Sequence, residues 1–142
     1  MMYDIKVPLE ENFKGTAQQK GETIRNGKII HFEKKNVSNA RSILAWGIKA
    51  NCREQIVPFE GAVFLRVTFV YSIKDRKKWG QPKTSRPDCD NLVKLLQDVL
   101  TDLGFYKDDS QITHLEVRKI YGENPCVYVH MEEHEIWRTW AK

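Results

Sequence analysis

The chain has 142 residues, enough for one domain with its own hydrophobic core and too few for two independent cores. Hydrophobic residues make up 41% and charged residues 30% of the chain, and the formal net charge is +4. This balance is typical of soluble proteins and is compatible with nucleic acid binding without indicating it. The longest apolar stretch, residues 62–73, is far shorter than the roughly 20 residues of a membrane helix, so we expect no membrane-spanning segment.

The amino-terminal residues show no basic region followed by an apolar segment, so we expect no secretory signal and a cytoplasmic location. Cys52, Cys89 and Cys126 are an odd number of cysteines at wide spacings. Such spacings fit neither a disulfide framework nor a zinc ribbon. We expect all three to be reduced thiols.

The first third of the chain predicts a strand, a hairpin and a helix. Apolar and polar residues alternate over residues 3–9, the pattern of a half-buried strand. An Asn-Gly dipeptide between two strand-forming runs predicts a hairpin over residues 22–33. Apolar residues at helical spacing then predict a helix over residues 38–53, with Asn36 or Ser38 as its cap.

The middle of the chain predicts the central strand, a basic loop and the longest amphipathic helix. Residues 61–73 are rich in β-branched and aromatic side chains, which favours a central strand. Residues 74–86 combine basic residues with Gly and Pro and show no periodicity, so we expect a mobile loop. A continuous leucine and valine stripe predicts a helix over residues 89–103, which Gly104 ends.

The last third predicts two strands, over residues 112–121 and 126–131, and a terminal helix in the tail that begins at Glu132. We therefore expect one α+β domain spanning residues 1–142, a mixed sheet with packed helices, in which residues 132–142 are a carboxyl-terminal extension. Four strand aromatics are expected in the core: Phe64, Phe69, Tyr121 and Tyr128.

An acidic cluster surrounds the start of the predicted helix 89–103. Asp88 precedes the helix, Asp90 lies in its first turn, and Lys94 follows four residues later on the same face. After the helix, a short loop could fold Asp108 or Asp109 back toward these side chains, although the sequence does not establish that return.

Two interpretations of this cluster are open. In the structural one, Asp88 caps the helix, Asp90 complements the helix dipole, and Asp90 pairs with Lys94 at the surface. In the functional one, the aspartates converge. Carboxylates about 5 Å apart repel by roughly 3 kcal/mol at an effective dielectric constant of 20, so a convergent trio requires a cation. Oxygen ligands favour Mg²⁺, with Mn²⁺ as a substitute.

Two motifs separated by the predicted helix form a specific signature. They are residues 87–94 (Pro-Asp-x-Asp-Asn-Leu-x-Lys) and residues 104–112 (Gly-Phe-x-Lys-Asp-Asp-x-Gln-Ile). In residue type and spacing they resemble the RusA family of Holliday-junction resolvases. The resemblance is closest over residues 86–131, and the elements before it follow the order of the family more loosely.

The resemblance implies a metal-dependent endodeoxyribonuclease from a bacterium or a phage that acts in DNA recombination and repair. It implies a homodimer that makes two symmetric nicks in a four-way junction. The catalytic residues that it implies are Asp88, Asp90, Lys94 and Asp109, of which the three aspartates would hold the metal. Asp108 and Asn91 are expected to support these ligands from beside them. Lys94 would neutralise negative charge that develops on the phosphate.

The basic segment leads straight into the acidic motif, which favours phosphate contacts beside the cut, with Trp79 available to stack on unpaired bases. The alternative is a solvated loop. The candidate DNA-binding residues are Lys14, Lys20, Lys74, Arg76, Lys77, Lys78, Trp79, Lys83 and Arg86. Two other functions remain open: a module that binds branched DNA without cutting it, and a Mg²⁺-dependent phosphatase that uses Asp-x-Asp.

Overall fold

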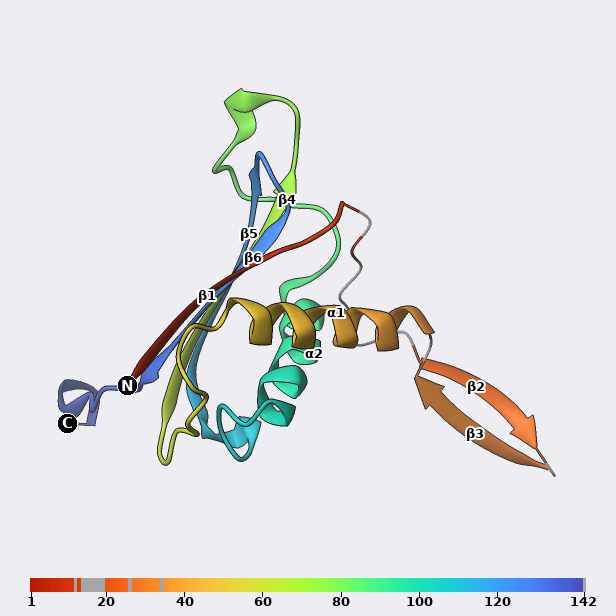
Figure 1. Cartoon of the computed structure of the whole chain (residues 1–142), viewed down its shortest axis with the longest axis horizontal. Helices are drawn as coiled ribbons and strands as arrows, with labels where there is room; N and C mark the ends of the chain where they lie inside the picture. Colours follow the sequence, from red (N-terminus) through yellow and green to blue (C-terminus); the bar gives the residue numbers. More distant parts are fainter. Residues whose placement is uncertain (12, 14–19, 26, 34, 142) are drawn as a thin grey trace.

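The computed structural model describes the chain except residues 12, 14–19, 26, 34 and 142, and Figure 1 shows the arrangement. Lys14 therefore lies outside the described residues, and so does the side chain of Lys20. In chain order, the strands and α-helices are β1 (Met2–Pro8), β2 (Lys20–Arg25), β3 (Lys28–Glu33), α1 (Lys35–Asn51), β4 (Val63–Ser72), α2 (Cys89–Asp102), β5 (Ile112–Gly122) and β6 (Cys126–Glu133). Three short 3-10 turns are η1 (Arg76–Lys78), η2 (Asp109–Gln111) and η3 (Arg138–Ala141).

The main sheet has four strands in the order β1-β6-β4-β5. Strand β4 pairs in parallel with β5, whereas β6 pairs antiparallel with both β1 and β4. A parallel pair needs a long crossover connection, and here α2 lies within it. The expected α+β domain with a mixed sheet is therefore confirmed.

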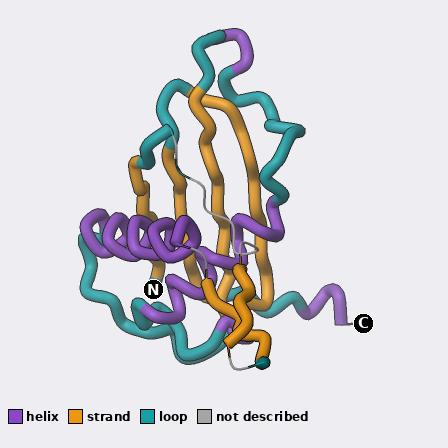
Figure 2. The backbone as a smooth tube through the Cα atoms, turned by 90° about the vertical axis from the view of Figure 1, so that its right-hand side faces the viewer, coloured by secondary structure: helices purple, strands orange, loops and turns teal. Residues whose placement is uncertain are grey.

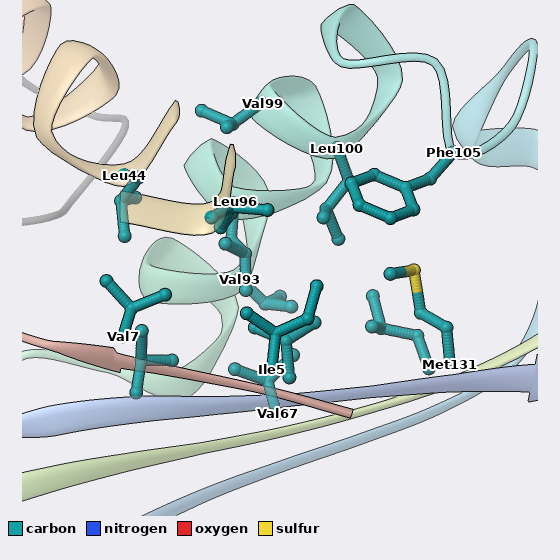
Figure 3. Packing of buried hydrophobic residues seen from close by; sticks show 14 of the residues in the cluster. Ile5, Val7, Leu44, Val67, Val93, Leu96, Val99, Leu100, Phe105 and Met131 are labelled. Atoms are coloured by element: carbon teal, nitrogen blue, oxygen red, sulfur yellow. The ribbon is translucent and has the colours of Figure 1, made fainter. Parts of the chain in front are cut away.

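Both α-helices lie on one side of this sheet (Figure 1). The alternation of β1 explains the contact: Tyr3, Ile5 and Val7 point to the helices and are buried, and the residues between them are exposed. Figure 3 shows Val7 and Ile5 beneath Leu44 of α1 and Leu96 of α2. Each fully buried side chain of this kind stabilises the fold by about 1.5–3 kcal/mol.

The hairpin β2–β3 forms a separate two-stranded sheet, as the Asn-Gly dipeptide in the sequence predicted. Its strands project away from the main sheet beyond the first residues of α1 (Figure 1). Of the helices in the described part of the chain, none is both long and apolar enough to cross a membrane.

The predictions for α1, the tail and Tyr128 were wrong in part. Helix α1 begins at Lys35, so both predicted caps, Asn36 and Ser38, lie inside it. The tail forms the short 3-10 turn η3 instead of an α-helix. Tyr128 is 45% exposed, because its neighbours in β6 face the helices and alternation turns Tyr128 to the other face of the sheet.

The basic segment 74–86 has more structure than its lack of periodicity predicted. It contains η1, and Asp75 caps this turn by accepting from the backbone N–H of Lys77 at 3.1 Å. Residues 80–83 then hydrogen-bond to the outer edge of β5, and Pro82 forms a bridge with Ile120. Figure 2 shows the segment descending from the end of the sheet to the start of α2. These bonds fix its position relative to the acidic motif.

Candidate active site

The acidic motif begins at the amino-terminal end of α2. Asp88 is the N-cap residue in extended conformation, yet its carboxylate makes no capping hydrogen bond. Only its backbone carbonyl takes part in the helix, accepting from the Leu92 N–H at 3.2 Å. Asp88, Asp90 and Lys94 are all exposed. The structural interpretation, in which the Asp88 side chain caps the helix, is therefore wrong, and its carboxylate is available for a ligand.

Lys119 of β5 holds the backbone that leads into this motif. Its ammonium group donates to the carbonyl of Ser85 at 2.8 Å and to that of Pro87 at 2.7 Å. Cys89 adds a weak contact, with its Sγ 3.9 Å from the carbonyl oxygen of Val117. The sequence analysis missed Lys119. One sequence feature could have identified it. A lysine stands between Val117 and Tyr121 on the helix-facing side of a strand, where an apolar residue is expected.

The second acidic motif surrounds η2, just before β5. Gln111 anchors it: its amide donates to the carbonyls of Phe59 and Gly61 at 2.9 Å each, and its side-chain oxygen accepts from the Lys107 N–H at 2.8 Å. This bonding fixes the backbone and leaves the carboxylate of Asp109 at the surface.

Asp108 and Asp109 have opposite pKa shifts. A hydrogen bond from the Ser110 hydroxyl lowers the pKa of Asp108. Desolvation raises the pKa of Asp109, and the negative charges of Asp108 and Asp98 raise it further. Asp109 thus lies among carboxylates, where a bound cation would be favourable.

Helix α2 separates Asp88 and Asp90 from Asp109 within one chain. At 1.5 Å per residue its 14 residues are about 21 Å long, and η2, which begins at Asp109, follows the carboxyl-terminal end of the helix in the chain. The Tyr106 hydroxyl donates to the Gln97 carbonyl at 2.8 Å, so the chain after α2 folds back against the carboxyl-terminal half of that helix. Among the residues described, no three His, Cys, Asp or Glu side chains form a group that could hold a metal ion. Within one chain, the loop after α2 does not bring Asp109 back to the amino-terminal end of that helix.

The basic candidates divide into exposed and packed side chains. Lys74, Lys77, Lys78 and Arg86 are exposed. By contrast, the Lys83 ammonium lies 5.1 Å from the Tyr71 ring centroid, and Lys83 also approaches the ring of Tyr121. The four exposed side chains can contact phosphates. Lys83, by contrast, contacts aromatic rings and so helps to hold its segment against the sheet.

The side chain of Trp79 contacts residues of its own segment and its neighbour. Its indole N–H donates to the Ile73 carbonyl at 2.8 Å, and the Arg76 guanidinium lies 5.6 Å from its ring centroid. Both residues line a surface depression of about 480 Å³ together with Lys74. Trp79 therefore has a structural role in the loop, and stacking on a base remains a prediction.

Comparison with known proteins identifies the family to which the chain belongs. The model of the family described as Endodeoxyribonuclease RusA matches residues 12–132, a span that contains both acidic motifs. The chain belongs to the RusA family of endodeoxyribonucleases. It is 41% identical over 135 residues to a protein of Lactococcus phage r1t named crossover junction endodeoxyribonuclease rusA, covering 94% of this chain and 99% of the phage protein. It is also 50% identical over 50 residues to the uncharacterized protein YqaN of Bacillus subtilis (strain 168), covering 35% of this chain and 34% of that protein.

The resemblance inferred from the two motifs is thus confirmed at the level of the family. As a RusA-family endodeoxyribonuclease, this chain has its acidic motifs on the helix-bearing side of the sheet, at the two ends of α2.

Proposed function

We propose that this RusA-family chain hydrolyses phosphodiester bonds in four-way DNA junctions, with a divalent metal and with Asp88, Asp90, Lys94 and Asp109 as its catalytic residues. The observation that supports this most directly is the state of Asp88. A helix N-cap aspartate normally accepts a backbone hydrogen bond, and this one does not, although Lys119 fixes the backbone beside it. The position is held rigidly while the carboxylate is left without a structural partner.

The chemistry of the donors fits Mg²⁺ or Mn²⁺, because three carboxylates provide hard oxygen ligands. Such an ion, when bound, polarises the phosphate and lowers the pKa of a coordinated water. The arrangement within one chain does not fit, since Asp109 lies beyond the opposite end of α2 from Asp88. A single chain therefore provides two separate parts of the proposed site.

The cationic side chains have distinct proposed roles. Lys94 lies one turn after Asp90 on the exposed face of α2, from which its ammonium group can reach the oxygens of a phosphate beside the carboxylates. There it stabilises negative charge that develops during hydrolysis. The exposed side chains of the basic segment bind neighbouring phosphates and offset the repulsion between DNA and the aspartates.

The substrate and the separation of the acidic motifs both support a homodimer. A four-way junction is resolved by two cuts, which requires two active sites, and two copies related by a two-fold axis provide them. The phage relative, whose name identifies it as a crossover junction endodeoxyribonuclease, supports this substrate.

Cleavage of a labelled synthetic four-way junction, compared with a linear duplex of the same sequence, tests the proposal. With Mg²⁺ we expect paired nicks in the junction and no cleavage after EDTA. The variant Asp90→Asn should abolish cleavage while junction binding persists, because it removes a ligand charge and eases the approach of phosphate. Asp102→Asn, an exposed aspartate at the other end of α2 that pairs with Arg41, is the matched control and should cut normally.

Junction binding without cleavage by the parent chain in Mg²⁺ or Mn²⁺ would favour a non-cleaving DNA-binding module. Equal cleavage of the duplex would remove the junction specificity. Loss of folding in Asp90→Asn, measured by circular dichroism, would instead indicate a structural role for that residue.

A further inference from the structure

The face of the main sheet that carries no helix has a row of polar side chains across its four strands. The strand register places one residue of each strand beside the next, and these residues alternate with the ones that pack against the helices. The members of this polar row, in strand order, are Lys6, Tyr128, Thr68 and Arg118. All four line a surface depression of about 560 Å³.

The polar row provides hydrogen-bond donors to this depression. Arg118 donates from Nε to the Thr68 hydroxyl at 3.1 Å, and its two terminal nitrogens have no partner among the residues described. Thr68 is only 8% exposed and accepts that bond, so its own O–H is left to donate. The Lys6 ammonium lies 5.5 Å from the ring centroid of Tyr128 and pairs with no carboxylate of a described residue. Guanidinium, ammonium and hydroxyl donors around one depression favour an anionic ligand.

The acidic side chains of the neighbouring rows already have partners. Arg66 donates to Glu116 at 2.8 Å. His130 contacts Asp4 at 2.6 Å and Glu132 at 3.3 Å. The two cations of the polar row have no such partner in the described part of the chain, so their charges remain available to a phosphate.

Aromatic rings continue from this face of the sheet onto the tail. His114 of β5 packs on Phe64 of β4 with their ring centroids 4.2 Å apart, and its ring lies 5.1 Å from that of Trp137. The Trp137 ring in turn lies 6.5 Å from the ring of Trp140 in η3. A chain of four rings therefore leads from the sheet to the tail, which Figure 1 shows on the side of the sheet away from the helices.

The two tryptophans of this chain of rings are exposed, although the tail is anchored. Trp137 is 46% and Trp140 is 82% exposed. The His134 N–H donates to the Ala62 carbonyl at 3.0 Å, and the His134 ring contacts the hydroxyl of Thr113. The Trp140 N–H also donates to the Trp137 carbonyl at 3.2 Å. Adjacent exposed indoles on an anchored segment form a surface on which planar rings can stack.

Phosphate-binding cations beside exposed aromatic rings are the composition of a surface for single-stranded nucleic acid. We propose that the helix-free face of this DNA-acting chain binds single-stranded DNA, with phosphates at the polar row and bases stacked on Trp137 and Trp140. Four residues of β4 separate Thr68 from Phe64, where the chain of rings begins, a distance of about 13 Å or roughly four nucleotides. A duplex stacks its bases internally and offers none to the indoles, so this surface selects unpaired strands.

This surface is separate from the proposed active site. The acidic motifs lie on the helix-bearing side of the sheet, at the two ends of α2. Lys6, Trp137 and Trp140 also lie outside residues 12–132, the span that the family model matches. The inference therefore does not depend on the catalytic residues proposed above, and it adds a second contact for DNA with an unpaired strand.

Binding of a labelled oligo(dT) strand, measured by fluorescence anisotropy in EDTA, tests the proposal. Lys6→Gln should reduce the slope of log affinity against log salt by about 0.7, the value for one phosphate contact to a single strand. Trp140→Ala should weaken binding by about 5- to 140-fold without changing that slope, because it removes the stacking of one base. Both residues are exposed, so both variants should fold, which circular dichroism checks.

Two matched controls lie on α1, on the other side of the sheet. Lys49→Gln removes an exposed cation, and Trp46→Ala removes a tryptophan that is 76% exposed. Both should bind oligo(dT) as the parent chain does. A duplex of the same length is the second comparison, and Trp140→Ala should change its affinity by less than about twofold.

Equal affinities of Lys6→Gln, Trp140→Ala and the parent chain for oligo(dT) would overturn the proposal. So would a loss of binding that appears only when Lys77 or Lys78 of the basic segment is neutralised. An equal loss of affinity for single strand and duplex in Trp140→Ala would also overturn it, because base stacking would then not be the cause. None of these results would affect the proposed nuclease activity, which cleavage of a fully paired junction measures on its own.

Discussion

Replacing Lys119 with Met should slow DNA cleavage, because Lys119 fixes the backbone from which Asp88 extends. The ammonium group donates two hydrogen bonds, to the carbonyls of Ser85 and Pro87, at 2.8 and 2.7 Å. Methionine has a similar length and no donor, so the substitution removes these bonds with little change in volume. Lys119 contacts the connection to the motif and not the proposed reacting groups, so it is a positioning residue.

The magnitude follows from the two bonds. A hydrogen bond from a charged donor contributes about 1.5–3 kcal/mol, and the bond to Ser85 is exposed to solvent and counts for less. We expect a loss of about 2–3 kcal/mol in the free energy of unfolding, or roughly 6–9 °C in Tm for a chain of this size. A misplacement of about 1 Å at a reacting group can slow the reaction about 100-fold. We therefore expect kcat to fall by about 10- to 100-fold.

Single-turnover cleavage of a labelled junction at saturating enzyme measures this step, and gel-shift titration measures junction affinity. Affinity should change less than threefold, because the basic segment keeps the backbone hydrogen bonds to β5 that Gly80, Gln81 and Lys83 make. Lys119→Arg should restore most of the rate, and Lys49→Met at the exposed end of α1 is the control. An unchanged kcat in folded Lys119→Met, or an equal loss in rate and affinity, would refute the positioning role.

Three further predictions concern stability and binding. Asp109→Asn should raise Tm slightly at neutral pH, because the pKa of the Asp109 carboxyl is raised in the native state. A raised native pKa means that the native carboxyl holds more protons than the unfolded one, so native stability falls as the pH rises above the unfolded pKa of about 3.9. The increase in Tm should therefore vanish below that pH. Leu96→Ala, in the fully buried stripe of α2, should lower the free energy of unfolding, measured in urea, by about 2–5 kcal/mol. Neutralising Lys77 or Lys78 should reduce the slope of log affinity against log salt by about 0.9, with cleavage at saturating protein unchanged; an unaltered slope would make the segment a solvated connection.

The strands and helices could be predicted because local patterns specify them. The apolar stripe of α2 has one arrangement that buries all its members, and Gly104 with a φ of 88° ends the helix as its sequence position indicated. The start of α1 and the structure of the tail depend on contacts that no local pattern contains. Segment 74–86 shows the same limit, because its order comes from pairing with β5 and not from its own periodicity.

Motif and spacing suggest the residues of the candidate site, but they do not determine how these residues are arranged in space. Spacing along a helix places Asp90 and Lys94 on one face, since the helical repeat is fixed. It does not determine where the chain goes after the helix, and here Gln111 binds the carbonyls of Phe59 and Gly61 at the far end of α2. Lys119 was missed because both of its hydrogen-bond partners, Ser85 and Pro87, are more than 30 residues away in the chain.

If the proposed homodimer brings together the carboxylates from the two ends of α2, one more quantity becomes predictable, the coupling of metal binding to assembly. If the complete carboxylate set exists only in the dimer, metal binds the dimer and not the monomer, and it must stabilise the dimer by mass action. With two sites per dimer and Mg²⁺ at ten times its dissociation constant, dimerisation should tighten by roughly 11², or about 100-fold. Sedimentation equilibrium with Mg²⁺ and with EDTA measures this ratio, and Asp109→Asn, which lacks a ligand, should lose most of the effect. A dimerisation constant that does not change with Mg²⁺ would show that each chain holds its metal alone, and the separation of Asp88 from Asp109 along α2 would then need another explanation.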